Sequence, residues 1–160
     1  MKTVFTSFLI LFCSVAFAQQ EIILADTAKQ ILNNNPSLQT ALYQYLDYSS
    51  CMSQKPENYL KLYSILSKEY LNKQFPNIKT AQEYKTHMID RSEIYHLIYL
   101  SIDRINFVKK SEVEIKFTFE SGNEGVLDKM EEIIYFKLEN QNWMYNGFNP
   151  QSLKVIETIK

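Results

Sequence analysis

Apolar side chains recur every three or four residues through the first half of the chain, which is the pattern of amphipathic helices. A first helix is expected from Ser37, which can cap it, to about Met52. A second begins at Pro56, a residue suited to a first helical turn. Its apolar side carries Tyr59, Leu60, Tyr63, Leu66, Tyr70 and Leu71.

Two further segments of this half are bounded by cap and break residues. Thr80 and Glu83 have the spacing of a capping box, which predicts a third helix from Ala81 to about Asp90. Residues 19–36 show only a weak helical pattern and end at a proline, whose preceding residue avoids the helical conformation. We treat 19–36 as a pre-segment and 37–160 as one domain.

After Ser92 the apolar residues alternate with polar ones, which predicts strands. His96 shares its parity with Ile98 and Leu100, so its side chain is expected to point inward. The apolar parity then changes, because Ile105 and Phe107 are odd-numbered. One extra residue would explain the change, and we predict a β-bulge near Asp103–Arg104 that bends the strand.

The later strands form a meander separated by polar turns at 109–111, 121–125 and 139–142. The clearest strand has one apolar face, from Val113 to Phe119, and one charged face, from Glu112 to Glu120. The next runs from 126 to 139, and Trp143 opens a last strand. The tail at 153–159 is expected as a short strand, a helix or a frayed end. Helices followed by antiparallel strands indicate an α+β fold.

The first eighteen residues have the pattern of an export signal. Lys2 precedes an apolar stretch, and Ala16-Phe17-Ala18 forms a cleavage site. The signal resembles those of Gram-negative bacteria, so we expect a soluble periplasmic protein, with the outside medium as the second address. An uncleaved N-terminal anchor is the alternative. The mature chain has no further apolar segment long enough to span a membrane.

Composition excludes several classes of function. The formal net charge of −1 offers no basic excess for nucleic acid. The three glycines serve turns and a strand end, so no Gly-rich phosphate loop exists, and no serine-nucleophile or Cys-x-x-Cys motif is present. Cys51 alone remains after signal cleavage, which excludes an internal disulfide, and we expect its burial. No cofactor or metal is expected.

The closing hairpin carries a family resemblance. Residues 132–145 read as an apolar strand, a polar turn, Trp143 and a short strand. Together with the preceding helices, this resembles the end of nuclear transport factor 2-like (cystatin-like cone) domains, although Asn142 replaces the usual glycine or lysine. The resemblance covers residues 37–148. It implies N-terminal helices packed on a strongly curved antiparallel sheet, whose open end often holds a ligand or an active site. Its members include isomerases, dehydratases and non-catalytic secreted proteins.

One acid/base cluster follows the third helix. The family's enzymes generally use Asp with His or Tyr inside the cone, which makes His96 with Asp90 or Glu93 the candidate catalytic set. The alternative is a capped helix end with a solvated Asp90 and a hydrogen-bonded core histidine. No spacing of histidines marks a metal site.

Eleven tyrosines are unusual for a chain of this length. A tyrosine is large and flat with one polar end, so it lines pockets well. The candidate ligand-binding residues are Tyr45, Tyr63, Tyr99, Phe117 and Trp143. The alternative is that these side chains are core. The charges at 129–132, with Glu112, Glu114 and Glu120, are expected to be solvated.

These patterns predict a non-catalytic function: binding of a small apolar molecule in the cone, or of a protein partner. A homodimer through the sheet is possible in such folds. An isomerase, dehydratase or hydrolase is the first alternative, and a secreted interaction or immunity-type protein is the second.

Overall fold

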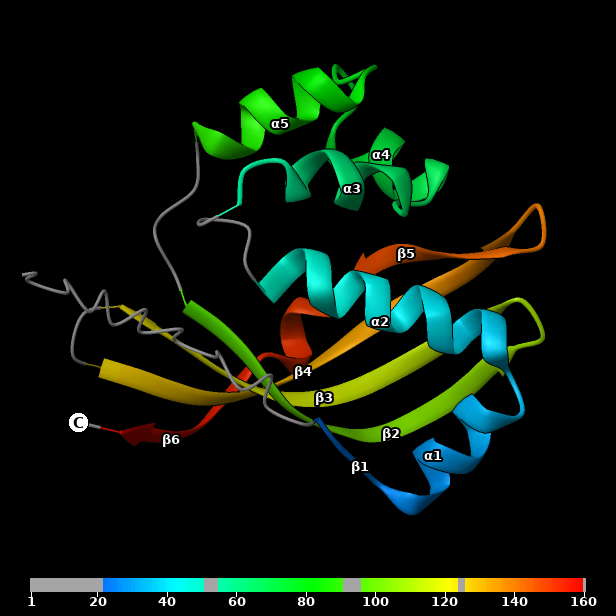
Figure 1. Cartoon of the computed structure of the whole chain (residues 1–160), viewed down its shortest axis with the longest axis vertical. Coiled ribbons are helices and arrows are strands. Elements are labelled where there is room, and N and C mark those ends of the chain that lie inside the picture. The colour runs from blue at the N-terminus through cyan, green and yellow to red at the C-terminus, as the bar shows by residue number, and fades with distance from the viewer. Residues whose placement is uncertain (1–21, 51–54, 91–95, 124–125, 160) are drawn as a thin grey trace, which may run out of the picture.

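The structure is a computed structural model that describes residues 22–50, 55–90, 96–123 and 126–159, with only the backbone at 96, 123 and 126. The signal at 1–18, Cys51 and Glu93 therefore lie outside the described residues. A curved sheet lies below a layer of helices (Figure 1). The strands are β1 (Ile23–Leu24), β2 (His96–Lys109), β3 (Glu112–Asn123), β4 (Val126–Glu139), β5 (Asn142–Phe148) and β6 (Lys154–Ile159).

The sheet order is β1-β2-β3-β4-β5, and β6 pairs with the first part of β4. All pairs are antiparallel except β1 with β2. The helices are α1 (Asp26–Asn33), α2 (Pro36–Ser50), α3 (Asn58–Ser64), α4 (Lys68–Gln74), α5 (Ala81–Ile89) and a 3-10 turn, η1 (Pro150–Ser152). Helix α2 crosses the concave side of the sheet, and α3 to α5 lie beyond it (Figure 1). None of the described helices is long and apolar enough to cross a membrane.

The capping box at the start of α5 is confirmed. The Glu83 amide donates to the Thr80 hydroxyl at 3.2 Å, and the Thr80 amide donates to the Glu83 carboxylate at 3.1 Å. The prediction for α2 is wrong by one residue, since the helix begins at Pro36 and Ser37 lies inside its first turn. Proline is favoured there because the first turn has no intrahelical partner for its amide.

The single helix predicted after Pro56 is wrong: two helices form, with a break at 65–67. Here the chain pairs with β5, because the Tyr145 amide donates to the Ile65 carbonyl and the Ser67 amide donates to the Tyr145 carbonyl, both at 2.8 Å. Ser67 then caps α4 by accepting from the Tyr70 amide at 3.0 Å. Tertiary pairing has replaced the helical hydrogen bonds that the apolar pattern implied.

Strand β2 contains the predicted bulge, since the register with β3 shifts between Ile102 and Arg104. Two more irregularities fall between Tyr99 and Ser101 and between Phe107 and Lys109. Leu100 has no paired residue in β3, so it reverses the alternation of buried and exposed side chains in the residues that precede it. The expectation that Ile98 faces inward is therefore wrong: its side chain is 38% exposed, whereas Tyr99 is 6% exposed. Three irregularities in one strand increase its twist and bend.

The predicted turn after β4 is confirmed at Asn140 and Gln141, whose φ values of 49° and 67° are those of a two-residue hairpin turn. The tail forms strand β6, and Val155, Ile156 and Ile159 on it are exposed. The turn predicted at 121–125 falls partly on 124–125, outside the described residues.

The hydrophobic core lies between the concave face of the sheet and the helices. Strand β3 has the predicted two faces: Val113, Ile115 and Phe117 are buried, while Lys116 forms a 2.8 Å ion pair with Glu131 on the convex side. Helix α1, in the pre-segment, also packs here, with Ala28 and Leu32 fully buried. Burying this face supplies the main stabilisation of the fold.

Candidate functional site

A carboxylate lies on the concave face of the sheet. Glu132 in β4 pairs directly with Phe117 in β3, so the two side chains share one face. Its neighbours on that face are Met130 and the fully buried Ile134. Glu132 is thus a charged residue in a row of core residues, with its side chain only partly exposed.

Within the part of the chain that the structure describes, Glu132 lacks the partners that a desolvated carboxylate normally has. No described residue donates a hydrogen bond to it or forms an ion pair with it, in contrast to Glu131 and Glu114 on the convex side. Burial raises the pKa of Glu132 from 4.5 to about 7. The group therefore exchanges between acid and carboxylate near neutral pH.

Four tyrosines from four elements form a cluster beside this carboxylate, which we call the tyrosine cluster: Tyr45 of α2, Tyr70 of α4, Tyr99 of β2 and Tyr145 of β5. The rings of Tyr45 and Tyr145 stack at 4.5 Å between centroids, and Tyr70 meets Tyr145 edge-on at 5.2 Å. These contacts hold the helical layer against the last strand.

The pKa values of all four phenols are raised, chiefly by burial. The charge of Glu132 raises each of them further. One carboxylate thus acts on hydroxyls from both the sheet and the helices. At neutral pH the phenols are protonated, and Glu132 is the group of this site that changes charge.

A buried hydrogen bond orients one end of the cluster. Ser49 donates its only hydroxyl proton to the Tyr45 carbonyl at 2.6 Å. In its 2.7 Å contact with the Tyr99 hydroxyl, Ser49 must therefore accept, and Tyr99 donates. The Tyr99 proton is committed to Ser49, and the Tyr99 oxygen is left with acceptor capacity only.

Gly147 makes room for the cluster. It has a φ of +106°, and a Cβ placed on it would lie 3.0 Å from the ring of Tyr70. Glycine adopts this backbone conformation without a steric penalty and lets the ring lie against β5. Next to Gly147 in the chain, the Asn146 side chain accepts a hydrogen bond from the Ser67 hydroxyl. The absence of a side chain at Gly147 therefore determines how closely the Tyr70 ring packs on β5.

The expectation that all charges at 129–132 are solvated is wrong for Glu132. Glu131 points to the convex side and Glu132 to the concave side, because successive side chains of a strand alternate. The signal was present in the sequence, since Glu132 has the parity of Ile134 and Phe136, two predicted core residues. Taken together, the four residues 129–132 indicate a solvated surface segment, and this interpretation does not recognise the inward parity of Glu132.

The candidate set of His96, Asp90 and Glu93 stays a prediction. Asp90 follows the last turn of α5 and is exposed. His96 begins β2, but only its backbone is described, and Glu93 lies outside the described residues.

The candidate ligand residues divide into two groups. Tyr45, Tyr99 and Phe117 come together in the interior, with the rings of Tyr99 and Phe117 at 5.1 Å. Tyr63 packs within the helical layer against Tyr84 at 5.5 Å, and Trp143 packs against Phe107 at 5.9 Å. The sequence therefore identified Tyr45 and Tyr99 of the tyrosine cluster and Phe117, the cross-strand neighbour of Glu132. It identified no carboxylate on the concave face.

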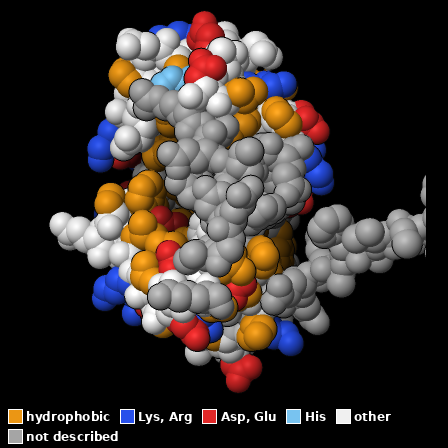
Figure 2. All heavy atoms as spheres, turned by 90° about the vertical axis from the view of Figure 1, so that its left-hand side faces the viewer, with side chains coloured by type: hydrophobic (Ala, Val, Ile, Leu, Met, Phe, Trp, Pro, Cys, Tyr) orange, Lys and Arg blue, Asp and Glu red, His pale blue; other side chains and the backbone are white. Residues whose placement is uncertain are grey.

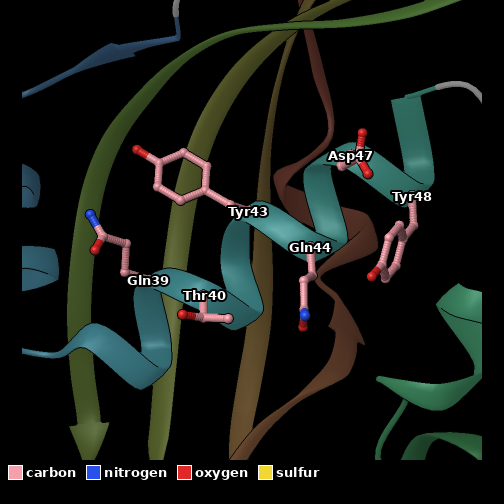
Figure 3. A pocket seen from close by; sticks show the side chains of 6 residues that line it. All are labelled: Gln39, Thr40, Tyr43, Gln44, Asp47 and Tyr48. Carbon is pink, nitrogen blue, oxygen red and sulfur yellow. The ribbon is translucent and has the colours of Figure 1, made fainter.

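The outer surface carries two hollows away from this site. The side chains of the first fan out from one helix, α2, without converging, as Figure 3 shows; they are Gln39, Thr40, Tyr43, Gln44, Asp47 and Tyr48. The second lies between α2 and β5 and includes Ser37, Ser64 and Trp143. Neither joins polar groups in the arrangement expected of a specific site. Within the described ranges, no three His, Cys, Asp or Glu side chains gather as a metal site would require.

Hydrophobic side chains also gather between the helices and the sheet on the side of the molecule seen in Figure 2. This is the side on which β2 begins (Figure 1).

Comparison with known proteins bears on the fold. No protein-family model and no curated protein sequence matches the chain. A solved structure from Novosphingobium aromaticivorans, provisionally assigned as a scytalone dehydratase, is 13% identical, with a TM-score of 0.50 over 82% of this chain and 89% of that one. An LEH-like epoxide hydrolase of M. tuberculosis, also 13% identical, gives a TM-score of 0.46 over 74% of this chain and 87% of that one. The chain shares the fold of the Novosphingobium structure, and its helices over the concave side of a bent, mostly antiparallel sheet agree with the α+β cone that the resemblance implied.

Proposed function

We propose that the concave side of the sheet binds a small, largely apolar molecule and that Glu132 is the polar group that recognises it. One observation carries the proposal: a partly exposed carboxylate without a partner among the described residues, set in a row of apolar side chains. Small-molecule sites combine apolar walls with few polar groups in this way. A purely structural strand would gain stability from an apolar residue at this position.

Acid/base catalysis is the second candidate function. A carboxyl group with a pKa of about 7 can accept and return a proton near neutral pH. Glu132 is therefore a candidate general base for an isomerase, dehydratase or hydrolase. In this role it would act without the set of His96 with Asp90 or Glu93. Pre-formed surroundings of Tyr45 and Tyr99 support a fixed geometry for it.

NMR spectroscopy of the ¹⁵N-labelled protein with a library of small aromatic and aliphatic compounds tests the binding proposal. We expect shift changes concentrated at Leu97, Met130 and Glu132 for a subset of compounds. Glu132→Leu should reduce these changes, whereas Glu131→Gln on the convex face should not. Shift changes confined to the outer hollows, or equal in both variants, would contradict the proposal.

Export and assembly are separate proposals. The signal pattern at 1–18 supports delivery to the periplasm, which fractionation of producing cells with N-terminal sequencing tests. The exposed apolar residues Val155 and Ile156 support contact with a second copy or another protein through the sheet. Light scattering that gives only the monomer mass at high concentration would remove the homodimer.

A further inference from the structure

We propose that the ligand recognised by Glu132 is an organic cation, with a protonated amine beside the carboxylate and an aromatic or aliphatic body on the concave face. This inference rests on the proposed function and narrows its ligand to one charge class. It follows from three features of the concave face: the absence of a counter-charge for Glu132 among the described residues, the direction of the hydroxyl protons, and the apolar surroundings.

The first feature is the missing counter-charge. Charged groups removed from water are normally paired, because an unpaired one loses its hydration without compensation. The other acidic residues of β3 and β4 with ion pairs have lysine or arginine partners on the convex or outer surface. On the concave face, the described residues that bury their side chains include no lysine, arginine or histidine. An ammonium group on the ligand would supply the partner.

The second feature is the direction of the hydroxyl protons. Tyr99 donates its proton to Ser49, so its oxygen can only accept from other groups. The phenols of Tyr45, Tyr70 and Tyr145 stay protonated, and each is within the electrostatic reach of Glu132. The hydroxyls of Tyr45, Tyr70 and Tyr145 hydrogen-bond with one another inside the cluster, so the Glu132 carboxylate is the charged acceptor at this end of the site. An ammonium group with three N–H donors matches it, whereas a ligand carboxylate would meet like charge.

The third feature is the apolar neighbourhood. Met130 and Leu97 are partly buried and pack against the core, so both leave apolar surface for a ligand body. The groups with titratable hydroxyls near Glu132 are Tyr45 of α2, Tyr70 of α4, Tyr99 of β2 and Tyr145 of β5. None of them changes charge below pH 8, because their pKa values are raised from 10. Of the residues described at this site, Glu132 therefore controls the charge.

Cation binding should be linked to the loss of the Glu132 proton. A bound ammonium favours the carboxylate, so the ligand competes with the proton below the pKa of about 7. With a single group of that pKa, the affinity for an amine that stays protonated should be about tenfold lower at pH 6 than at pH 8. A neutral ligand of the same shape would not show this dependence.

Three probes of matched size separate the charge classes: benzylamine, benzyl alcohol and benzoate. Each is titrated into the ¹⁵N-labelled protein by NMR at pH 6 and pH 8, with the wild type, Glu132→Gln and the convex-face control Glu131→Gln. Glutamine keeps the size of the side chain and removes its charge, and circular dichroism checks that the variant is folded. We expect benzylamine to bind at least tenfold more tightly than benzoate at pH 8, and Glu132→Gln alone to remove this preference.

The outcomes distinguish the two proposals. Equal binding of benzylamine and benzyl alcohol at the concave face, independent of pH, would overturn the cation inference and leave small-molecule binding standing. Preference for benzoate would overturn it as well. If none of the probes shifts resonances of the concave face while library compounds do not either, both the inference and the proposed function fail.

Discussion

Replacing Glu132 by glutamine should change how the stability of the protein depends on pH. In the folded chain burial raises the pKa of Glu132 from 4.5 to about 7. A group whose folded pKa lies above its unfolded pKa stabilises the fold at low pH and loses this contribution as the pH rises through the folded value. The window of loss therefore runs from about pH 4.5 to about pH 7.

The size of the effect follows from the shift. One pKa unit corresponds to about 1.4 kcal/mol, so this shift sets an upper limit of about 2.5 kcal/mol between pH 5 and pH 8. The side chain is partly exposed, and solvent screening reduces the limit to about 1 kcal/mol. Glutamine has no charge to bury. The unfolding free energy of Glu132→Gln minus that of the wild type should therefore be about 1 kcal/mol larger at pH 8 than at pH 5.

Urea unfolding followed by circular dichroism at pH 5, 6, 7 and 8 measures this difference. The matched control is Glu131→Gln, which removes the 2.8 Å ion pair with Lys116 on the convex face. Surface pairs contribute about 0–1 kcal/mol, and this control should not acquire the same pH dependence. Equal responses of the wild type and Glu132→Gln to pH between 5 and 8 would contradict the desolvation of Glu132.

Three other changes test the structure around the site. Gly147→Ala should destabilise the protein by about 1–3 kcal/mol in a thermal melt, because alanine is strained at this φ and its Cβ displaces Tyr70; a change below the error would contradict the close approach. Ser49→Ala should destabilise the protein by about 1–3 kcal/mol in chemical denaturation, because it leaves the Tyr99 hydroxyl proton without an acceptor, whereas Tyr99→Phe should cost only about 1 kcal/mol. A larger cost for Tyr99→Phe than for Ser49→Ala would show that Ser49 is the donor in this pair. Thr80→Ala should cost about 1 kcal/mol and increase hydrogen exchange in α5, and unchanged exchange would show that the capping box contributes little.

Local signals in the sequence predicted the elements that depend on local interactions. The capping box of Thr80 and Glu83 is formed by neighbouring residues, so its pattern alone places the start of α5. The alternation from Val113 to Phe119 likewise identifies β3 and its buried face.

Long-range pairing explains what the sequence did not predict. The break between α3 and α4 exists because residues 65–67 bond the backbone of Tyr145, which lies far along the chain. The irregularity before Ser101 depends on pairing with β3, and it reversed the expected face of Ile98. Apolar periodicity contains no information about either contact.

The candidate site shows the same division. Tyr45 and Tyr99 could be selected from their residue type, because large side chains with one polar end line interiors well. Glu132 could have been placed on the concave face by extending the parity of Ile134 and Phe136 back along the strand. That no described residue pairs with Glu132 could not be predicted, because pairing depends on which side chains of other elements reach it.

Titration of the Glu132 carboxyl group shows whether this side chain is desolvated on the concave face. Selective ¹³C labelling of glutamate, with assignment by Glu132→Gln, allows the carboxyl shift to be followed from pH 3 to pH 9 in the folded protein. We expect a midpoint of about 7 for Glu132. A midpoint near the ordinary value of 4.5 would show that the carboxylate is solvated, and neither the binding role nor the acid/base role would then stand.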